Sequence, residues 1–169
     1  GTAILMRYTL RLLTAQQYER ASAMICACDV IRKEHENLFG KSRISIGLWV
    51  GSATTPNRMA DAVLKYDELY SGKSDENPFI ILKCPWCGAQ MGVVQKRSGL
   101  REIKGYYKKP EAHKKKSIIF KCSNTECAFS DKSFPLPLFV VDETIYDNTP
   151  TLLLGTVDKF AMLPFRPQA

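Results

Sequence analysis

The sequence contains no apolar run long enough to span a bilayer, and only two histidines, His35 and His113, among its 169 residues. Arg7 and Arg11 also interrupt the N-terminal apolar run that a signal peptide would need. With so few histidines, no Ser-His-Asp or Cys-His catalytic arrangement is recognisable. Glycine and proline occur in ordinary numbers and 45% of the residues are hydrophobic, so a folded core is expected.

The length corresponds to one domain, or to one domain with an insertion. The chain begins Gly-Thr-Ala-Ile-Leu, directly in a strand-like run and without Met, so we expect a piece of a longer protein. Six cysteines in a chain with a real core do not fit a secreted disulfide framework. We therefore expect a reducing, cytoplasmic location, with four of the six thiols on a metal ion.

The net charge of +7 is concentrated in one stretch. Residues 96–121 contain ten Lys and Arg against two acidic residues, a net charge of +8, and the rest of the chain carries −1. Lys114, Lys115 and Lys116 form the densest part of this basic loop, and Tyr106-Tyr107 lies within it. Two interpretations stay open: a solvated charged face, or a surface that contacts phosphates and stacks on unpaired bases.

Hydrophobic periodicity predicts alternating strands and helices. The strands are predicted at residues 2–8, 43–50, 79–82, 136–141 and 151–154. Helices are predicted from Thr14, as an N-cap, to about Glu36, and from Thr55-Pro56 to about Tyr70, with a helical turn at 158–162. A strand–helix–strand–helix–strand order argues for an α/β fold with a parallel sheet.

Two cysteine pairs interrupt this pattern. The first is Cys84-Pro-Trp-Cys87, followed by Gly88, and the second is Cys122-Ser-Asn-Thr-Glu-Cys127. Such pairs gather four thiolates around one tetrahedral ion, and thiolate is a soft ligand that suits Zn²⁺. We predict a structural zinc ion on these four cysteines; spacing alone leaves iron open, and free or redox-active thiols are the alternative.

The two ends of the chain carry runs that resemble motifs of superfamily-two helicases. Residues 3–17, AILMRYTLRLLTAQQ, resemble the strand and turn of motif Ia, and residues 150–160, PTLLLGTVDKF, resemble motif Ic. Gly51 follows the strand at 44–50 and falls where motif Ib has its glycine, so the order of the motifs matches. With a four-cysteine insert between them, the chain resembles the large helicase-related proteins of DISARM-type anti-phage defence systems.

This resemblance implies an incomplete RecA-like parallel sheet in residues 1–78 and 138–169, with a zinc ribbon and its basic loop inserted at 79–137. It implies a fragment of an ATP-dependent helicase or translocase motor that contributes nucleic-acid-binding motifs. The implied partners are nucleic acid, DNA in preference to RNA, the remainder of the helicase core, and defence-complex proteins, with no membrane. The residues implied to lie against nucleic acid are Arg7, Thr9, Arg11, Gln16, Gly51, Thr156 and Lys159.

No Walker A motif is present, so ATP and Mg²⁺ are expected to bind elsewhere in the parent protein, and this fragment alone is expected to be inactive. Ser71-Gly-Lys-Ser74 resembles the tail of a P-loop, but Asp67 occupies the first glycine position. Val140-Val-Asp-Glu143 resembles a Walker B strand, yet it precedes the motif Ic-like run; a returning strand of the insert is the alternative. The rival function is a non-enzymatic zinc-ribbon module that binds nucleic acid or a protein.

Overall fold

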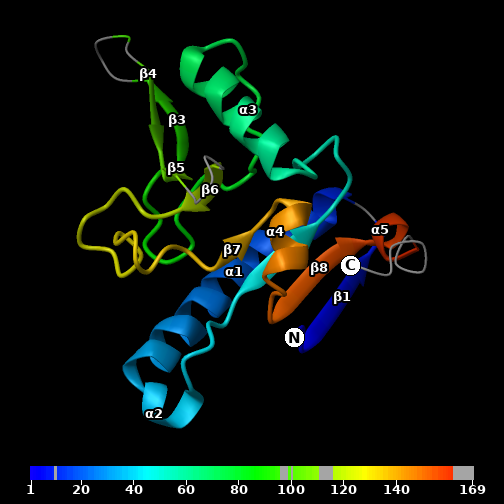
Figure 1. Cartoon of the computed structure of the whole chain (residues 1–169), viewed down its shortest axis with the longest axis vertical. Helices are drawn as coiled ribbons and strands as arrows, with labels where there is room; N and C mark the ends of the chain where they lie inside the picture. Colours follow the sequence, from blue (N-terminus) through cyan, green and yellow to red (C-terminus); the bar gives the residue numbers. More distant parts are fainter. Residues whose placement is uncertain (10, 96–98, 100, 111–115, 162–169) are drawn as a thin grey trace.

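A four-stranded parallel sheet, in the order β1-β8-β2-β7, forms the centre of the molecule (Figure 1). The computed structural model describes residues 1–9, 11–95, 99, 101–110 and 116–161, with the side chains of residues 11–13 excepted. The strands are β1 Ile4–Tyr8, β8 Leu152–Thr156, β2 Ile46–Trp49 and β7 Leu138–Phe139. The predicted α/β fold with a parallel sheet is confirmed.

Both faces of the sheet are covered, as parallel sheets require. Side chains alternate along each strand, so Leu48 and Leu154 share one buried cluster with α1 (Arg11–Glu34). Trp49 and Leu153 point to the other face and pack with α4 (Asp142–Asp147) and α5 (Val157–Ala161). Because side chains alternate along the strands, one helical layer packs on each side of the sheet.

Strand β1 lies at the edge of this sheet and pairs only with β8 among the described residues. The sequence predicts a buried strand here, and the strand forms, but Ile4 is 53% exposed and Leu5 is 60% exposed. The prediction of burial is wrong for this chain because no described element covers that edge.

Helix α1 begins at Arg11, so Thr14 lies inside the helix and is buried instead of capping it. A short helix α2 (Glu36–Phe39) follows, and α3 (Met59–Ser71) ends where Gly72 adopts φ +77°, a conformation that favours glycine. Across the described ranges, no helix has the length and apolar character needed to cross a membrane.

The cysteine module contains two antiparallel hairpins. Strand β3 (Gly92–Gln95) pairs with β4 (Arg101–Lys104), and β5 (Tyr106–Pro110) pairs with β6 (Lys116–Phe120). The strand predicted at 79–82 is absent from the described structure, because Ile80 adopts φ +53° and turns the chain. Helix α3 packs against β6 and β4, so it accompanies the module more closely than the sheet (Figure 1).

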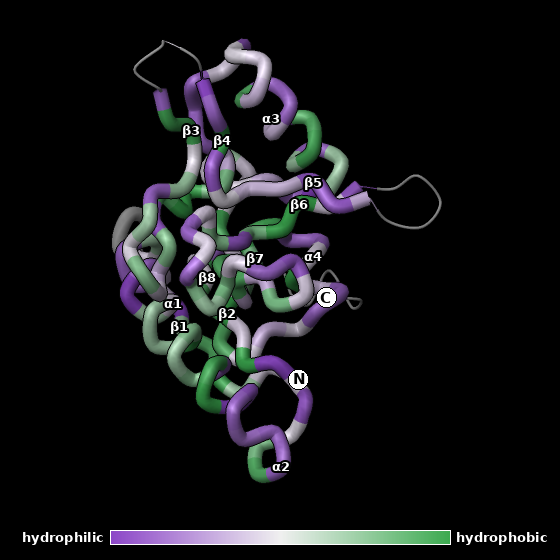
Figure 2. Tube along the Cα trace, turned by 90° about the vertical axis from the view of Figure 1, so that its left-hand side faces the viewer, coloured by the Kyte–Doolittle hydropathy of each residue, from purple (hydrophilic) through white to green (hydrophobic). Residues whose placement is uncertain are grey.

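One buried core runs from the sheet into the module. Ile46 and Leu154 of the sheet belong to the same cluster as Phe79, Tyr106 and Phe120 of the module. The three module rings lie with their centroids 5.1–5.6 Å apart in edge-to-face arrangements. Figure 2 shows the hydrophobic stretches gathered in the middle of the molecule, around β2 and β6. The inserted module is therefore part of the main core.

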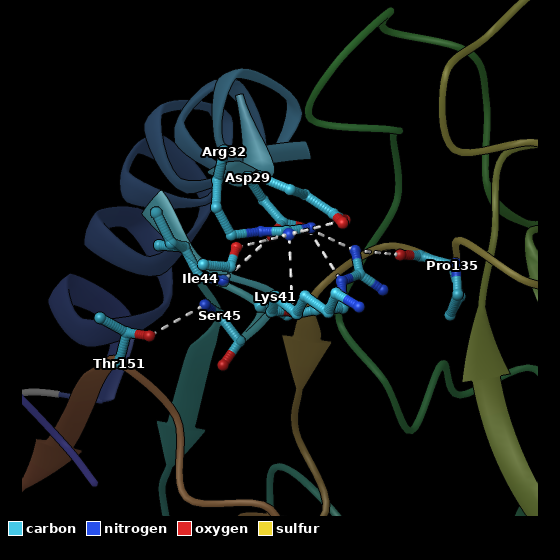
Figure 3. A network of polar contacts seen from close by, with 10 residues as sticks. Asp29, Arg32, Lys41, Ile44, Ser45, Pro135 and Thr151 are labelled. Carbon is cyan, nitrogen blue, oxygen red and sulfur yellow. Dashed lines mark hydrogen bonds and ion pairs between the residues drawn. The ribbon is translucent and has the colours of Figure 1, made fainter. Parts of the chain in front are cut away.

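A buried carboxylate on α1 connects this helix to the segment before β2 and to the end of the cysteine module (Figure 3). Asp29 has no exposed side-chain surface and accepts hydrogen bonds from Arg32 Nε at 2.9 Å and from Arg43 Nη2 at 2.6 Å. The backbone N–H of Ile44 donates to the same carboxylate at 3.0 Å. Arg43 Nη2 also donates to the carbonyl oxygen of Pro135 at 2.8 Å. The network joins α1, the approach to β2 and the end of the module.

We expect Asp29→Ala to destabilise the chain by about 3–5 kcal/mol, because it removes the buried carboxylate that Arg32 and Arg43 share. The matched control is Glu36→Ala, which removes a carboxylate that is 44% exposed and lies 3.2 Å from the same guanidinium. That control should cost at most about 1 kcal/mol. Urea unfolding followed by circular dichroism measures both changes, and equal losses would contradict the proposed importance of the buried carboxylate.

Candidate metal centre and nucleic-acid interface

The two cysteine pairs come together in one cluster. The sulfurs of Cys84, Cys87, Cys122 and Cys127 all lie within 4.8 Å of one another. The Sγ–Sγ distance is 3.9 Å between Cys84 and Cys127 and 3.4 Å between Cys87 and Cys122. A tetrahedral ion with Zn–S bonds of about 2.3 Å would hold its sulfurs roughly 3.8 Å apart, whereas a disulfide needs about 2.05 Å. The cluster thus fits a tetrahedral metal and contains free thiols.

The local backbone explains why the first pair forms a tight turn. Gly88 adopts φ +75°, which a residue with a Cβ rarely adopts, and its N–H donates to the carbonyl oxygen of Cys84 at 2.8 Å. The Cys84 N–H in turn donates to Ala89 at 2.8 Å. In the second pair, the N–H of Asn124 points at Cys122 Sγ from 3.4 Å. Amide groups aimed at sulfur stabilise the thiolate form that a metal requires.

Burial has a large effect on these thiols. Desolvation raises the pKa of Cys84, Cys122 and Cys127 to about 11 in each case. Cys87 is more exposed. Desolvation raises its pKa, but hydrogen bonds from the Ala89 backbone and from the neighbouring thiols together lower it by more. The pKa of Cys87 therefore falls below its usual value. Without a cation, Cys84, Cys122 and Cys127 are therefore protonated at neutral pH, and metal binding must displace their protons.

The remaining cysteines belong to α1. Cys26 is fully buried and Cys28 is partly buried, and neither is in the four-sulfur cluster. Burial raises the pKa of the Cys26 thiol, and Cys84 and Cys127 are among the neighbours that raise it further. Cys26 belongs to the same buried cluster as Cys84, Cys122 and Cys127, so its predicted packing role is confirmed, whereas Cys28 belongs to neither core cluster of the described residues.

The residues predicted to lie against nucleic acid gather mainly at one edge of the sheet. Thr9, Gly51 and Thr156 lie at or just beyond the carboxyl ends of β1, β2 and β8. These three strands are neighbours, with Tyr8 opposite Thr156 and Trp49 opposite Gly155 in the register. Crevices at the carboxyl ends of parallel strands are the usual ligand sites of open α/β sheets.

Accessibility divides these residues into two groups. Arg7, Thr9 and Gln16 are exposed, and Gly51 is partly exposed. Thr156 is only 1% exposed, and the Lys159 side chain is 14% exposed. Lys116 is exposed at the start of β6. Lys114, Lys115 and the side chain of Arg11 lie outside the described residues.

A network of hydrogen bonds closes the buried part of this edge, around Lys159. The Lys159 ammonium donates to the Asp142 carboxylate at 2.6 Å and to the Asn57 side-chain oxygen at 3.3 Å. The backbone N–H of Asp142 donates to Pro56 at 3.3 Å, and the Glu143 carboxylate accepts the N–H of Met59 at 2.6 Å. The segments that follow β2, β7 and β8 are thus locked together.

Two buried hydroxyls lie in the segments that follow β2 and end β8. Thr55 and Thr156 are at most 1% exposed, and neither hydroxyl has a hydrogen-bond partner within the described part of the chain. An unpaired buried hydroxyl costs about 1–3 kcal/mol, so a partner supplied from outside the described residues would stabilise this edge.

The sequence alone indicates little of this network. It marks Asp142 and Glu143 only as part of a Walker B-like run, and it does not single out Asn57. The usable signal is a polar residue soon after each predicted strand, as in Thr54-Thr55-Pro56-Asn57 after β2. Residues 140 and 141 follow β7, which pairs in parallel with β2 of the main sheet, and Asp142 and Glu143 begin α4.

The fold and the site together define a mixed α/β unit in which a parallel sheet carries an integrated four-cysteine cluster. No protein-family model matches the chain. Along 98% of its length, however, it is 39% identical to a segment of the DISARM protein DrmA of Bacillus paralicheniformis. That segment makes up 14% of the relative, so the chain spans a small part of a much longer protein.

We expect the purified chain to contain about one equivalent of zinc, since four thiol ligands fill all positions of a tetrahedral site. Cys122→Ala should abolish stoichiometric binding and lower the melting temperature, while Cys28→Ala, outside the cluster, should retain the metal. Elemental analysis with thermal unfolding measures both effects. Iron in place of zinc would correct the metal assignment, and full metal content in Cys122→Ala would contradict the ligand set.

Zinc affinity should fall as the pH is lowered. The pKa of about 11 for Cys84, Cys122 and Cys127 means that protons compete for the buried ligands throughout the neutral range. Competition with a chromophoric chelator between about pH 8 and pH 6 measures the change in zinc affinity, after correction for the chelator's own protonation. An apparent affinity independent of pH would show that the thiols are already ionised in the metal-free chain.

Proposed function

We propose that this chain is a segment of a helicase-type nucleic-acid motor of a DISARM-type defence system. The carboxyl edge of its parallel sheet contacts the nucleic-acid backbone, and its four-cysteine cluster holds a structural zinc ion. The longer protein couples ATP hydrolysis to movement on nucleic acid, DNA in preference to RNA, in the cytoplasm. The ATP and Mg²⁺ sites belong to other segments of that protein.

One observation carries the nucleic-acid part of the proposal. Residues from three separate motif-like runs, Thr9, Gly51 and Thr156, lie at or just beyond the carboxyl ends of neighbouring parallel strands. Hydroxyls, backbone N–H groups and cations in such a row suit phosphate oxygens. The similarity to a segment of the DISARM protein DrmA supports the defence role.

The exposed part of this edge would make the first contacts. Arg7, Thr9 and Gln16 are accessible as they stand. Lys159 is held by Asp142, so its contact with phosphate requires that ion pair to open. Thr156 is buried on the face of β8 that Leu152 and Leu154 share with α1, so its contact with phosphate requires this part of the edge to open. In the described arrangement, Lys159 positions α5 against the segments that follow β2 and β7.

The motor assignment has a direct check in the sequence of the parent protein. A Gly-Lys-Thr or Gly-Lys-Ser phosphate-binding motif should precede this segment, and an Asp-Glu motif should follow within about 40 residues, the length of one further βα step. A parent protein without both motifs would favour the rival function, a non-enzymatic zinc module that binds nucleic acid or a protein.

Arg7→Ala combined with Thr9→Val should weaken binding of a fluorescent DNA oligonucleotide and reduce the salt dependence of the affinity. Loss of one cationic phosphate contact lowers the slope of log K against log salt by about 1. The matched control is Lys41→Ala, which removes an exposed charge before β2, at the opposite edge of the sheet. Fluorescence anisotropy at several salt concentrations provides the measurement, and equal effects of the two changes would contradict a specific role for the carboxyl edge.

A further inference from the structure

A groove separates the cysteine module from the edge of the parallel sheet. Its volume is about 890 Å³, and its walls are the start of α3 with β6 on one side and β7 with α4 on the other (Figure 1). Ile118, Leu136 and Leu138 line its floor and are buried. Neither the cysteine cluster nor the carboxyl edge of the sheet accounts for this groove.

Strand β6 presents an open edge to the groove. Within the described structure β6 pairs only with β5, and the N–H of Ile118 points away from that partner to the Met59 sulfur at 3.3 Å. A thioether is a weak acceptor, and methionine is flexible enough to move aside. The N–H of Leu136 already donates to the carbonyl oxygen of Phe120 at 2.8 Å, which closes one end of the edge. A carbonyl from an added strand would be a better partner for Ile118.

The charges at the mouth of the groove differ between its walls. Arg58, Lys109 and Lys116 are exposed on the α3 and β6 side. Glu143 and Asp147 are exposed on the α4 side, and the Glu143 carboxylate is already engaged by the Met59 N–H at 2.6 Å. The wall that offers the strand edge is therefore cationic and complements acidic side chains.

We propose that this groove binds an extended peptide of a partner protein, with alternating apolar and acidic residues, by strand addition to β6. Apolar side chains would face the buried floor, and acidic ones would face the exposed mouth of the groove, where Arg58, Lys109 and Lys116 lie, since successive residues of a strand point to opposite sides. About four residues, roughly 13 Å of extended chain, would match the part of β6 that precedes Phe120.

A nucleic-acid strand fits this groove less well. The two rings in its lining, Phe120 and Phe139, are buried and half-buried, so they offer no open face for base stacking. Phosphates would also meet Glu143 and Asp147 on the opposite wall. The inference goes beyond the proposed motor function, because the carboxyl edge can bind nucleic acid whether or not the groove binds a peptide.

The test uses the zinc-loaded chain and a fluorescein-labelled octapeptide of alternating Val and Glu. We expect saturable binding by anisotropy, at least tenfold weaker binding of the same peptide with alternate backbone nitrogens methylated on its pairing edge, and no binding of the Val-Lys counterpart. Hydrogen exchange of the Ile118 amide should slow at least tenfold when the Val-Glu peptide is bound. Absence of binding, or equal binding of the methylated peptide, would overturn the proposal.

Charge reversal locates the binding. Lys109→Glu combined with Lys116→Glu should weaken the Val-Glu peptide at least tenfold, while Lys41→Glu combined with Lys73→Glu makes the same charge change at exposed positions that do not line the groove. Zinc content and circular dichroism confirm that both variants fold. Equal effects of the two pairs would refute the groove. Competitive displacement of the peptide by oligothymidylate that depends on Lys109 and Lys116 would reassign it to nucleic acid.

Discussion

The buried carboxylate of Asp29 is the constraint on which the arrangement of the molecule depends. A carboxylate with no exposed surface is tolerated only when cations and N–H groups surround it, and Arg32, Arg43 and Ile44 supply them. Arg43 extends the network to the carbonyl of Pro135 and lies over the Phe134 ring, 4.2 Å from its centroid. One charge on α1 thereby fixes the approach to β2 and the return of the inserted module.

This link changes how the cysteine module relates to the sheet. Cys84, Cys122 and Cys127 belong to the same buried cluster as Ile46 of β2, and α1 places Cys26 beside them. A metal ion on the cysteines would therefore stabilise the core that also supports the sheet. Metal binding and sheet packing are coupled through shared side chains, so the module is a structural element of the fold and more than a support for the basic loop.

The features predicted best from the sequence are those set by local spacing. The cysteine pairs need only short turns to converge, and the apolar runs at 43–50 and 151–154 coincide with β2 and β8, in which every residue is buried. The partner of each element is a tertiary matter that periodicity does not encode. The sequence predicts a helix that covers almost all of α3, yet nothing in it indicates that this helix packs against β6. Likewise, Thr156 is a polar residue at a strand end, and its burial lies on the face of β8 that Leu152 and Leu154 share with α1.

The sealed part of the carboxyl edge sets a condition for any phosphate that reaches Thr156. Lys159 would exchange the Asp142 carboxylate for a phosphate, so the ammonium itself would remain paired throughout. Asp142 is only 1% exposed, so the loss of this counter-ion would cost free energy. Phosphate contacts at the exposed Arg7 and Thr9 would have to offset that cost. The carboxyl edge of the sheet is therefore closed around Lys159 and open beside β1. The proposed phosphate contacts would form first at Arg7 and Thr9 and only then at Lys159.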